Sequence, residues 1–118
     1  MKASVRAVDR LMKYSLSFPE AWEDHPWEDT VVKVRKKIFV FVGIYEQQLS
    51  LTVKLPESRD YALTLDWTKP TGYGLGKAGW ITAHIPLHAD VPIDLFEEWI
   101  DESYRAVAPK TLVKQLDA

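Results

Sequence analysis

The chain has 118 residues, 47% of them hydrophobic, and a formal net charge of −2 at pH 7. This length is typical of one domain, and no shift in composition marks a second, so we predict a single domain over residues 1–118. The absence of cysteine excludes disulfides and thiolate metal sites, and it favours a cytoplasmic location. The negative net charge excludes a global attraction to phosphate, so binding of nucleic acid would depend on a local patch.

The N-terminal part of the chain combines a helical pattern with an acidic stretch. Apolar residues recur at helical spacing over Ala3–Leu16, which predicts an amphipathic first helix. Charges scattered along this segment make a secretion signal unexpected. Residues 19–29 are rich in acids, proline and tryptophan and follow neither the helical nor the strand period. We therefore expect an irregular loop that Trp22 and Trp27 anchor to the body of the domain.

The middle of the chain predicts three strands. The valines of Val31–Val34, the basic string Arg35–Lys37 and the apolar run Ile38–Tyr45 follow one another as in a hairpin with a charged turn. The apolar run is too short to cross a bilayer, so no membrane partner is expected. Gln48–Leu55 alternates between apolar and polar residues and predicts a half-buried third strand.

The last half of the chain continues with a short helix, a hairpin and two further helices. Proline in the first turn favours a short helix over Glu57–Leu65. The glycine-rich Lys69–Gly79 and the alternating Trp80–Ile85 together predict a hairpin. An apolar stripe predicts a helix over Pro92–Ala108, and Lys110–Leu116 is expected to add a short closing helix.

The order of these elements indicates the fold class. Helix, three strands, short helix, two strands and helix is typical of an α+β domain in two layers, with all helices packed on one face of an antiparallel sheet. We therefore predict a five-stranded antiparallel sheet with helices on one face.

A glycine-rich string in the last third of the chain invites comparison with a phosphate-binding loop. A Walker-type loop needs four residues between its glycine and the Gly-Lys pair, whereas three lie between Gly72 and Gly76, and Ala78 replaces the metal-binding Ser or Thr. The string therefore predicts a connection within a hairpin. Its alternative role is contact with a ligand or nucleic acid through Tyr73 and Lys77.

The sequence carries no enzyme signature. His84 and His88 are four residues apart, but this spacing binds metal on a helix and here spans a strand end and a turn. No Gly-x-Ser-x-Gly elbow is present, and the acids near residues 20–29 lack the burial that paired-carboxylate catalysis needs. We predict no metal, no cofactor and no catalytic residues. An enzyme would need His84, His88 and Lys77 to converge in one cleft.

The face of the sheet away from the helices offers a candidate surface. If Leu49, Leu51 and Val53 face the helices, alternation places polar, basic and aromatic side chains on the opposite face. That set consists of Ser50, Thr52, Lys54, Trp80, Thr82 and His84, to which Phe39, Phe41 and Tyr45 can be added from the apolar strand. Aromatic rings beside cations such as Lys33 can stack bases and hold phosphates. Cover by another segment or a second copy of the chain is the alternative.

Four motifs in the right order resemble one family of small bacterial proteins. They are Asp24-His25-Pro26-Trp27, Lys33-Val34-Arg35-Lys36-Lys37-Ile38-Phe39, the Gly72–Trp80 string, and Asp101-Glu102-Ser103-Tyr104 through Val107-Ala108-Pro109-Lys110. On these motifs the chain resembles the MmcQ/YjbR family over nearly its whole length. The resemblance implies a fold like that of the type III secretion chaperones and a double-wing mode of DNA binding, in which two hairpins act as wings.

Carried onto this sequence, the resemblance defines two wings. The first would comprise Lys33 and the Arg35–Lys37 turn, with Lys36 at its centre, and the second the Gly72–Lys77 loop. The first hypothesis is therefore weak, salt-sensitive binding of DNA through Lys33, Arg35, Lys36, Lys37, Tyr73 and Lys77. The second is a protein-interaction or self-associating module that uses Phe39, Phe41, Lys54, Trp80 and His84.

Overall fold

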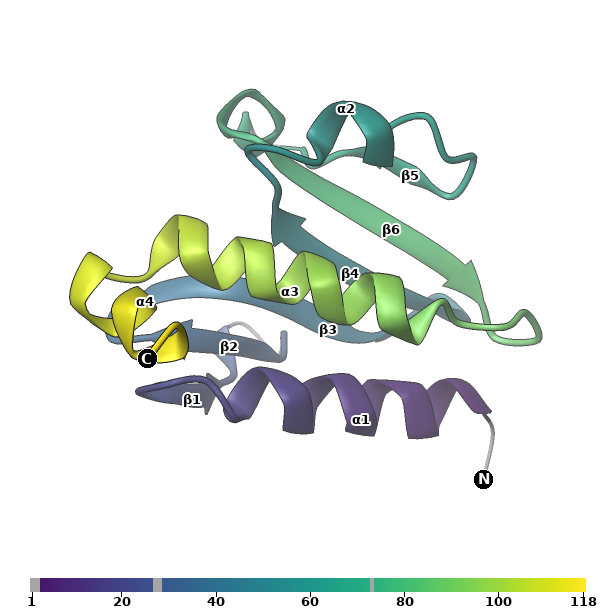
Figure 1. The fold of residues 1–118 in the computed structure, drawn as a ribbon. Coiled ribbons are helices and arrows are strands. Elements are labelled where there is room, and N and C mark those ends of the chain that lie inside the picture. The colour runs from purple at the N-terminus through teal and green to yellow at the C-terminus, as the bar shows by residue number, and fades with distance from the viewer. Residues whose placement is uncertain (1–2, 27–28, 73) are drawn as a thin grey trace.

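The computed structural model describes residues 3–26, 29–72 and 74–118. Its strands come in runs separated by helices, as the α+β prediction requires (Figure 1). In chain order they are α1 (Ala3–Leu16), β1 (Ala21–Asp24), β2 (Val31–Val34), β3 (Lys37–Tyr45), β4 (Gln48–Lys54), α2 (Arg59–Ala62), β5 (Thr68–Pro70), the 3-10 helix η2 (Leu75–Ala78), β6 (Trp80–Pro86), α3 (Ile93–Val107) and α4 (Lys110–Leu116).

The described strands form one antiparallel sheet in the order β1-β2-β3-β4-β6-β5. The sheet has six strands, so the prediction of five is wrong by one. The additional strand, β1, lies in the segment that we expected to be an irregular loop, and it pairs with β2 from Ala21 opposite Val34 to Asp24 opposite Val31. As an edge strand it buries neither of its faces, and its sequence therefore lacks the alternation that marks the other strands.

The helices cover one face of this sheet, as predicted. In Figure 1, α1 and α3 run side by side, and α3 crosses β3 and β4 while α1 packs against β3 and its neighbours β1 and β2. The short helix α2 contacts β6. Alternate side chains of the strands point into this layer and are fully buried, among them Val40, Leu51 and Ile81. The predicted bounds of α1 and α4 are confirmed, and α3 is shorter than predicted by one residue at each end. The short helix α2 covers only the centre of its predicted range.

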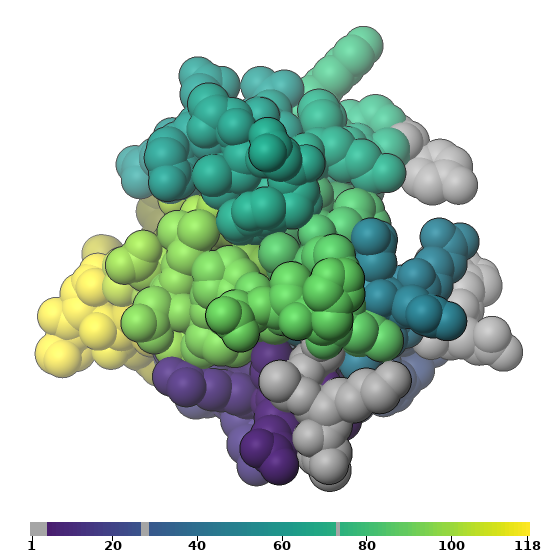
Figure 2. All heavy atoms as spheres, turned by 90° about the vertical axis from the view of Figure 1, so that its right-hand side faces the viewer, coloured from purple at the N-terminus to yellow at the C-terminus, as the bar shows by residue number. Residues whose placement is uncertain are grey.

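The other face of the sheet, called here the outer face, is the one that carries the candidate surface. Figure 2 views the molecule from the side, with the outer face on the right, where the blue β3–β4 turn and the teal-green loop after β5 stand out on either side of a hollow. Among residues 3–26, 29–72 and 74–118, no helix is long and apolar enough to cross a membrane.

Candidate nucleic-acid interface

The first wing is the hairpin of β2 and β3. Its strands are fixed by buried valines, and the chain reverses at Arg35, which takes a left-handed backbone conformation with φ of 56°. Lys36 and Lys37 follow at the tip, and both are exposed. Neither lysine has an ion-pair partner among the residues that the structure describes, so both charges face solvent. The prediction of a basic turn at this position is confirmed.

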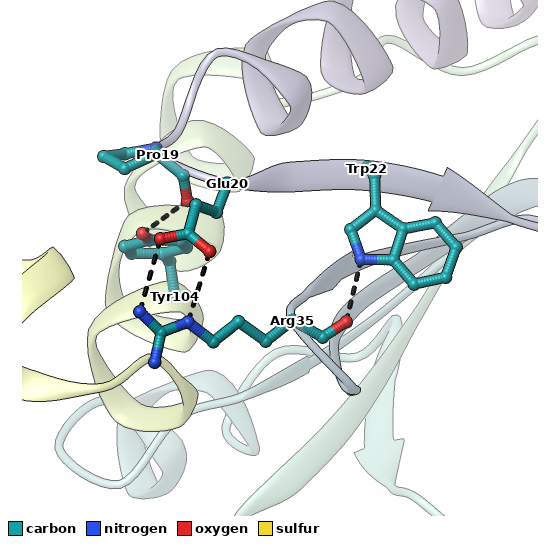
Figure 3. Close-up of polar contacts among 5 residues, drawn as sticks. All are labelled: Pro19, Glu20, Trp22, Arg35 and Tyr104. Carbon is teal, nitrogen blue, oxygen red and sulfur yellow. Dashed lines mark hydrogen bonds and ion pairs between the residues drawn. The ribbon is translucent and has the colours of Figure 1, made fainter.

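The other two cations of the wing are paired with acids that come from the first, acidic part of the chain. The Glu20 carboxylate accepts hydrogen bonds from the Arg35 guanidinium at 3.2 and 3.3 Å, and the Trp22 indole donates to the Arg35 carbonyl at 2.8 Å (Figure 3). Lys33 Nζ lies 2.7 Å from Asp24 and 5.2 Å from the centre of the Trp22 ring. These contacts are possible because β1 places its side chains directly beside β2.

The pKa directions agree with these pairings. A hydrogen bond from Lys33, together with the His25 backbone N–H, lowers the pKa of Asp24, so this carboxylate is ionised at neutral pH. The Glu20 carboxylate raises the pKa of Arg35. Both pairs lie at the surface, where water screens charges and an ion pair contributes little to stability. Their main effect is to lower the positive charge that the wing presents to a ligand.

A β-bulge at the base of the first wing changes the direction of one predicted surface residue. The register between β2 and β3 shifts between Val32 and Lys33, which leaves Phe39 as an extra residue in β3. Phe39 is fully buried on the helix side, with its ring 5.1 Å from the ring of Tyr104. Its placement on the outer face was wrong, because simple alternation along the strand does not anticipate a bulge.

The bulge also interrupts the pairing of β3 with β4. The paired register begins at Val40 opposite Val53, so the backbone groups of Phe39 and Lys54 do not meet each other. Ser103 of α3 fills this position, because its hydroxyl accepts a hydrogen bond from the Lys54 N–H at 2.8 Å and donates one to the Phe39 carbonyl. The first wing therefore projects past the end of β4 and leaves a notch in the sheet.

The second wing is the glycine-rich loop between β5 and β6. The predicted simple hairpin connection is folded into a turn and the 3-10 helix η2, with Gly74 and Gly79 at left-handed φ of 78° and 96°. Gly76 is buried, and a Cβ atom on it would lie 3.0 Å from the Pro70 side chain and 3.1 Å from the Thr71 carbonyl. Lys77 is exposed and has no ion-pair partner among the described residues. Tyr73 lies outside the described residues.

A cleft of about 540 Å³ lies between the two wings. Its floor combines aliphatic side chains with the rings of Phe41 and Trp80, whose centres are 6.1 Å apart at an interplanar angle of 73°. Lysines from the first wing and from the end of β4 surround this floor, and no carboxylate of residues 3–26, 29–72 and 74–118 lines it. The lining residues are Pro26, Lys33, Lys36, Lys37, Ile38, Phe41, Lys54, Leu75, Trp80, Ala106 and Val107.

A second hollow of about 340 Å³ continues the cleft along the outer face. The two share Phe41 and Leu75, and the second adds hydroxyl groups from Ser50, Thr52 and Thr71. The hydroxyl groups of Thr52 and Thr71 lie 2.9 and 3.0 Å from that of Thr82, which makes a short chain of hydrogen bonds from β4 through β6 to the residue that follows β5. The polar character predicted for this face is therefore confirmed.

His84 is on the outer face but away from the cleft. It lines a separate pocket at the β5 edge, together with Lys69 and Trp67, and burial followed by the charge of Lys69 lowers its pKa. Residues 3–26, 29–72 and 74–118 contain no cluster of three or more potential metal ligands. His84 therefore lies at the β5 edge of the sheet, whereas Lys77 stands on the second wing.

The structure brings together most of the predicted site residues and adds several that sequence reasoning missed. Lys33, Lys36, Lys37, Lys54, Phe41 and Trp80 line one cleft, and Arg35 and Lys77 stand on its flanking wings. The missed residues are Pro26, Ile38, Leu75, Ala106 and Val107, the last two from the end of α3. Ile38 faces the cleft because of the bulge, so its role could be predicted only if the position of the bulge were known. Val107 could be predicted only if the position of the end of α3 beside the notch were known.

Comparison with known proteins agrees with the resemblance noted in the sequence. The sequence model of the YjbR family matches residues 16–106. A crystal structure of Deinococcus radiodurans protein DR2400, with the domain DUF419, is similar over 99% of this chain and 92% of that one, with 27% identity and a TM-score of 0.73. No curated protein matches the chain. Because the match covers most of the chain and includes both wings, the chain belongs to the YjbR family.

Proposed function

We propose that the chain binds DNA through its two wings and the cleft between them. The observation that carries this proposal is the cleft itself, in which Lys36, Lys37 and Lys54 surround two aromatic rings and none of the described residues adds a carboxylate to the lining. Ammonium groups neutralise phosphates, and aromatic rings stack on bases. We assign the protein no enzymatic activity, and we place it in the cytoplasm, where DNA is accessible to it.

Binding is expected to be weak and sensitive to salt. The net charge of −2 opposes association with a polyanion. Two of the predicted contacts, Lys33 and Arg35, are already paired with acids, which leaves Lys36, Lys37, Lys54 and Lys77 free among the described residues. Neutralising about four phosphates gives a slope of log affinity against log salt of about −3 to −4.

The test is fluorescence anisotropy of labelled DNA with wild-type protein and two double variants. Lys36→Glu plus Lys37→Glu reverses two charges at the first wing and should weaken binding by about tenfold or more at low salt. Arg6→Glu plus Lys13→Glu makes the same change of net charge on α1, which packs on the other face of the sheet, and should have a much smaller effect. Equal losses in both double variants, or no binding at low salt, would overturn the proposal.

A second candidate function is self-association or protein binding through the outer face. The observation in its favour is apolar exposure, since Trp22, Tyr45 and Leu75 are 43, 40 and 37% exposed. Sedimentation analysis tests self-association directly. A dimer that dissociates when Leu75 is changed to Glu would support this candidate, whereas a monomer at all concentrations would count against self-association.

A further inference from the structure

We propose that the cleft between the wings holds an unpaired nucleotide, so that the chain binds single-stranded DNA in preference to duplex. This inference rests on the proposed function and specifies its ligand. Phe41 and Trp80 present aromatic surface inside the cleft. A base in a duplex is stacked on both faces and offers only its edges, whereas an unpaired base offers a face to an aromatic ring.

The volume of the cleft points to the same ligand. About 540 Å³ falls within the range of 300–1,000 Å³ that is usual for sites holding a small molecule. A stiff duplex cannot place a base in such a cleft without first taking it out of the stack, and the lost stacking and pairing weaken its binding. A single strand has no base pair to break, so the stacking of its base on the aromatic rings contributes fully to binding.

The charge pattern also fits one nucleotide better than a long duplex backbone. Lys36 and Lys37 at the tip of the first wing and Lys54 at the end of β4 line the same cleft as the two rings, so the phosphates next to a stacked base meet more than one ammonium group there. The paired state of Lys33 and Arg35 removes the two further cations with which the first wing would follow a duplex. A compact group of charges remains.

The adjoining hollow provides room for the next base of the strand. It shares Phe41 and Leu75 with the cleft and is bordered by the hydroxyl groups of Ser50, Thr52 and Thr71. Hydroxyls both donate and accept hydrogen bonds, so they suit the edges of any base. Asp29 also lines this hollow and repels phosphate, which favours a base over the backbone there.

The experiment compares affinities for three probes: a single strand of roughly 16 thymidines, which is the upper end of known site sizes, the corresponding duplex, and dTMP. Wild-type protein should bind the strand about tenfold more tightly than the duplex, and dTMP more weakly than either. Equal or tighter binding of the duplex would overturn the inference while leaving the proposed function intact. No binding of either DNA would overturn the proposed function as well. Binding of dTMP as tight as that of the strand would make the cleft a mononucleotide site and overturn the preference for a strand.

Variants of Trp80 separate stacking from charge. Trp80→Leu should weaken strand binding about tenfold, Trp80→Phe should retain most of it, and duplex binding should change little. Tyr61→Leu, at an aromatic residue 60% exposed on α2, is the matched control. Because Trp80→Leu could affect folding, the strand should also quench the tryptophan emission of the wild type more than that of Trp80→Phe. Equal quenching, or equal loss for Trp80→Leu and Tyr61→Leu, contradicts stacking on Trp80.

Discussion

The hydroxyl of Ser103 donates a hydrogen bond to the carbonyl of Phe39, 64 residues earlier in the chain, at 2.5 Å. The same hydroxyl accepts the N–H of Lys54, so one side chain of α3 satisfies both backbone groups that the bulge leaves without strand partners. Ser103 is fully buried. A buried polar backbone group without a partner is costly, which makes this contact a requirement for the notch between the wings.

Replacement of Ser103 should therefore destabilise the fold. Ser103→Ala leaves the Lys54 N–H and the Phe39 carbonyl unpaired, and we expect a loss of about 1–3 kcal/mol in the free energy of unfolding. Urea denaturation measures it. Ser17→Ala is the matched control, because Ser17 also donates to a backbone carbonyl but is exposed, and its effect should stay within about 0.5 kcal/mol. Similar midpoints for both variants would contradict the role assigned to Ser103.

Phe39 and Phe41 should respond differently to the same substitution. Phe39→Ala removes a fully buried ring from the core and should cost about 3–5 kcal/mol of stability. Phe41→Ala should cost less, since Phe41 is only partly buried, but it should weaken DNA binding because the ring lines the cleft. Thermal or urea unfolding and anisotropy together check both. A larger loss of stability for Phe41→Ala would contradict the bulge.

Removal of the Glu20 charge should strengthen DNA binding. Glu20→Gln frees the charge of Arg35 for phosphate, so we expect affinity to rise about two- to fivefold and the salt slope to steepen by about 0.7–0.9. The control is Glu46→Gln, which makes the same charge change at another exposed residue of positive φ, in the β3–β4 turn. If both variants gain equally, the effect is one of net charge, and the pairing of Glu20 with Arg35 does not limit binding.

His84 should make stability depend on pH below neutrality. Burial and Lys69 lower its pKa in the folded state, so on acidification the unfolded chain takes up this proton first. Its contribution to stability is present above the unfolded pKa of about 6.5 and is lost as pH falls toward the folded pKa. His84→Gln should therefore lose less stability than wild type between pH 7.5 and 5.5 in urea denaturation. Parallel losses would contradict the shift.

The sequence predicted the architecture well where one face of an element is buried and the other is not. The alternation of Gln48–Leu55 and the stripe over Pro92–Ala108 record which side chains face the core, and β4 and α3 follow these patterns. The strand β1 was not predicted, because an edge strand that is exposed on both faces does not alternate between apolar and polar residues. The turn at Arg35–Lys37 was predictable because buried runs on both sides required the chain to reverse there.

The site was predictable in composition but not in arrangement. Lysines at turns and aromatics on the outer face could be read from the sequence, and they do line one cleft. The side of the sheet to which Phe39 points could not be predicted, because a bulge of one residue interrupts the alternation of side chains along the strand. Nor could the pairing of Glu20 with Arg35 and of Asp24 with Lys33, since these contacts depend on β1.

The two edge strands of the sheet determine whether a strand of another molecule can pair with it. One edge is β1, four residues long and ending in Glu23 and Asp24, and the other is β5, three residues long and ending in Pro70, which has no N–H to donate. Short edges with charge and proline oppose the addition of a further strand from another chain. Growth of the sheet from either side is therefore disfavoured, and a face of the sheet is where we expect a neighbouring molecule to bind.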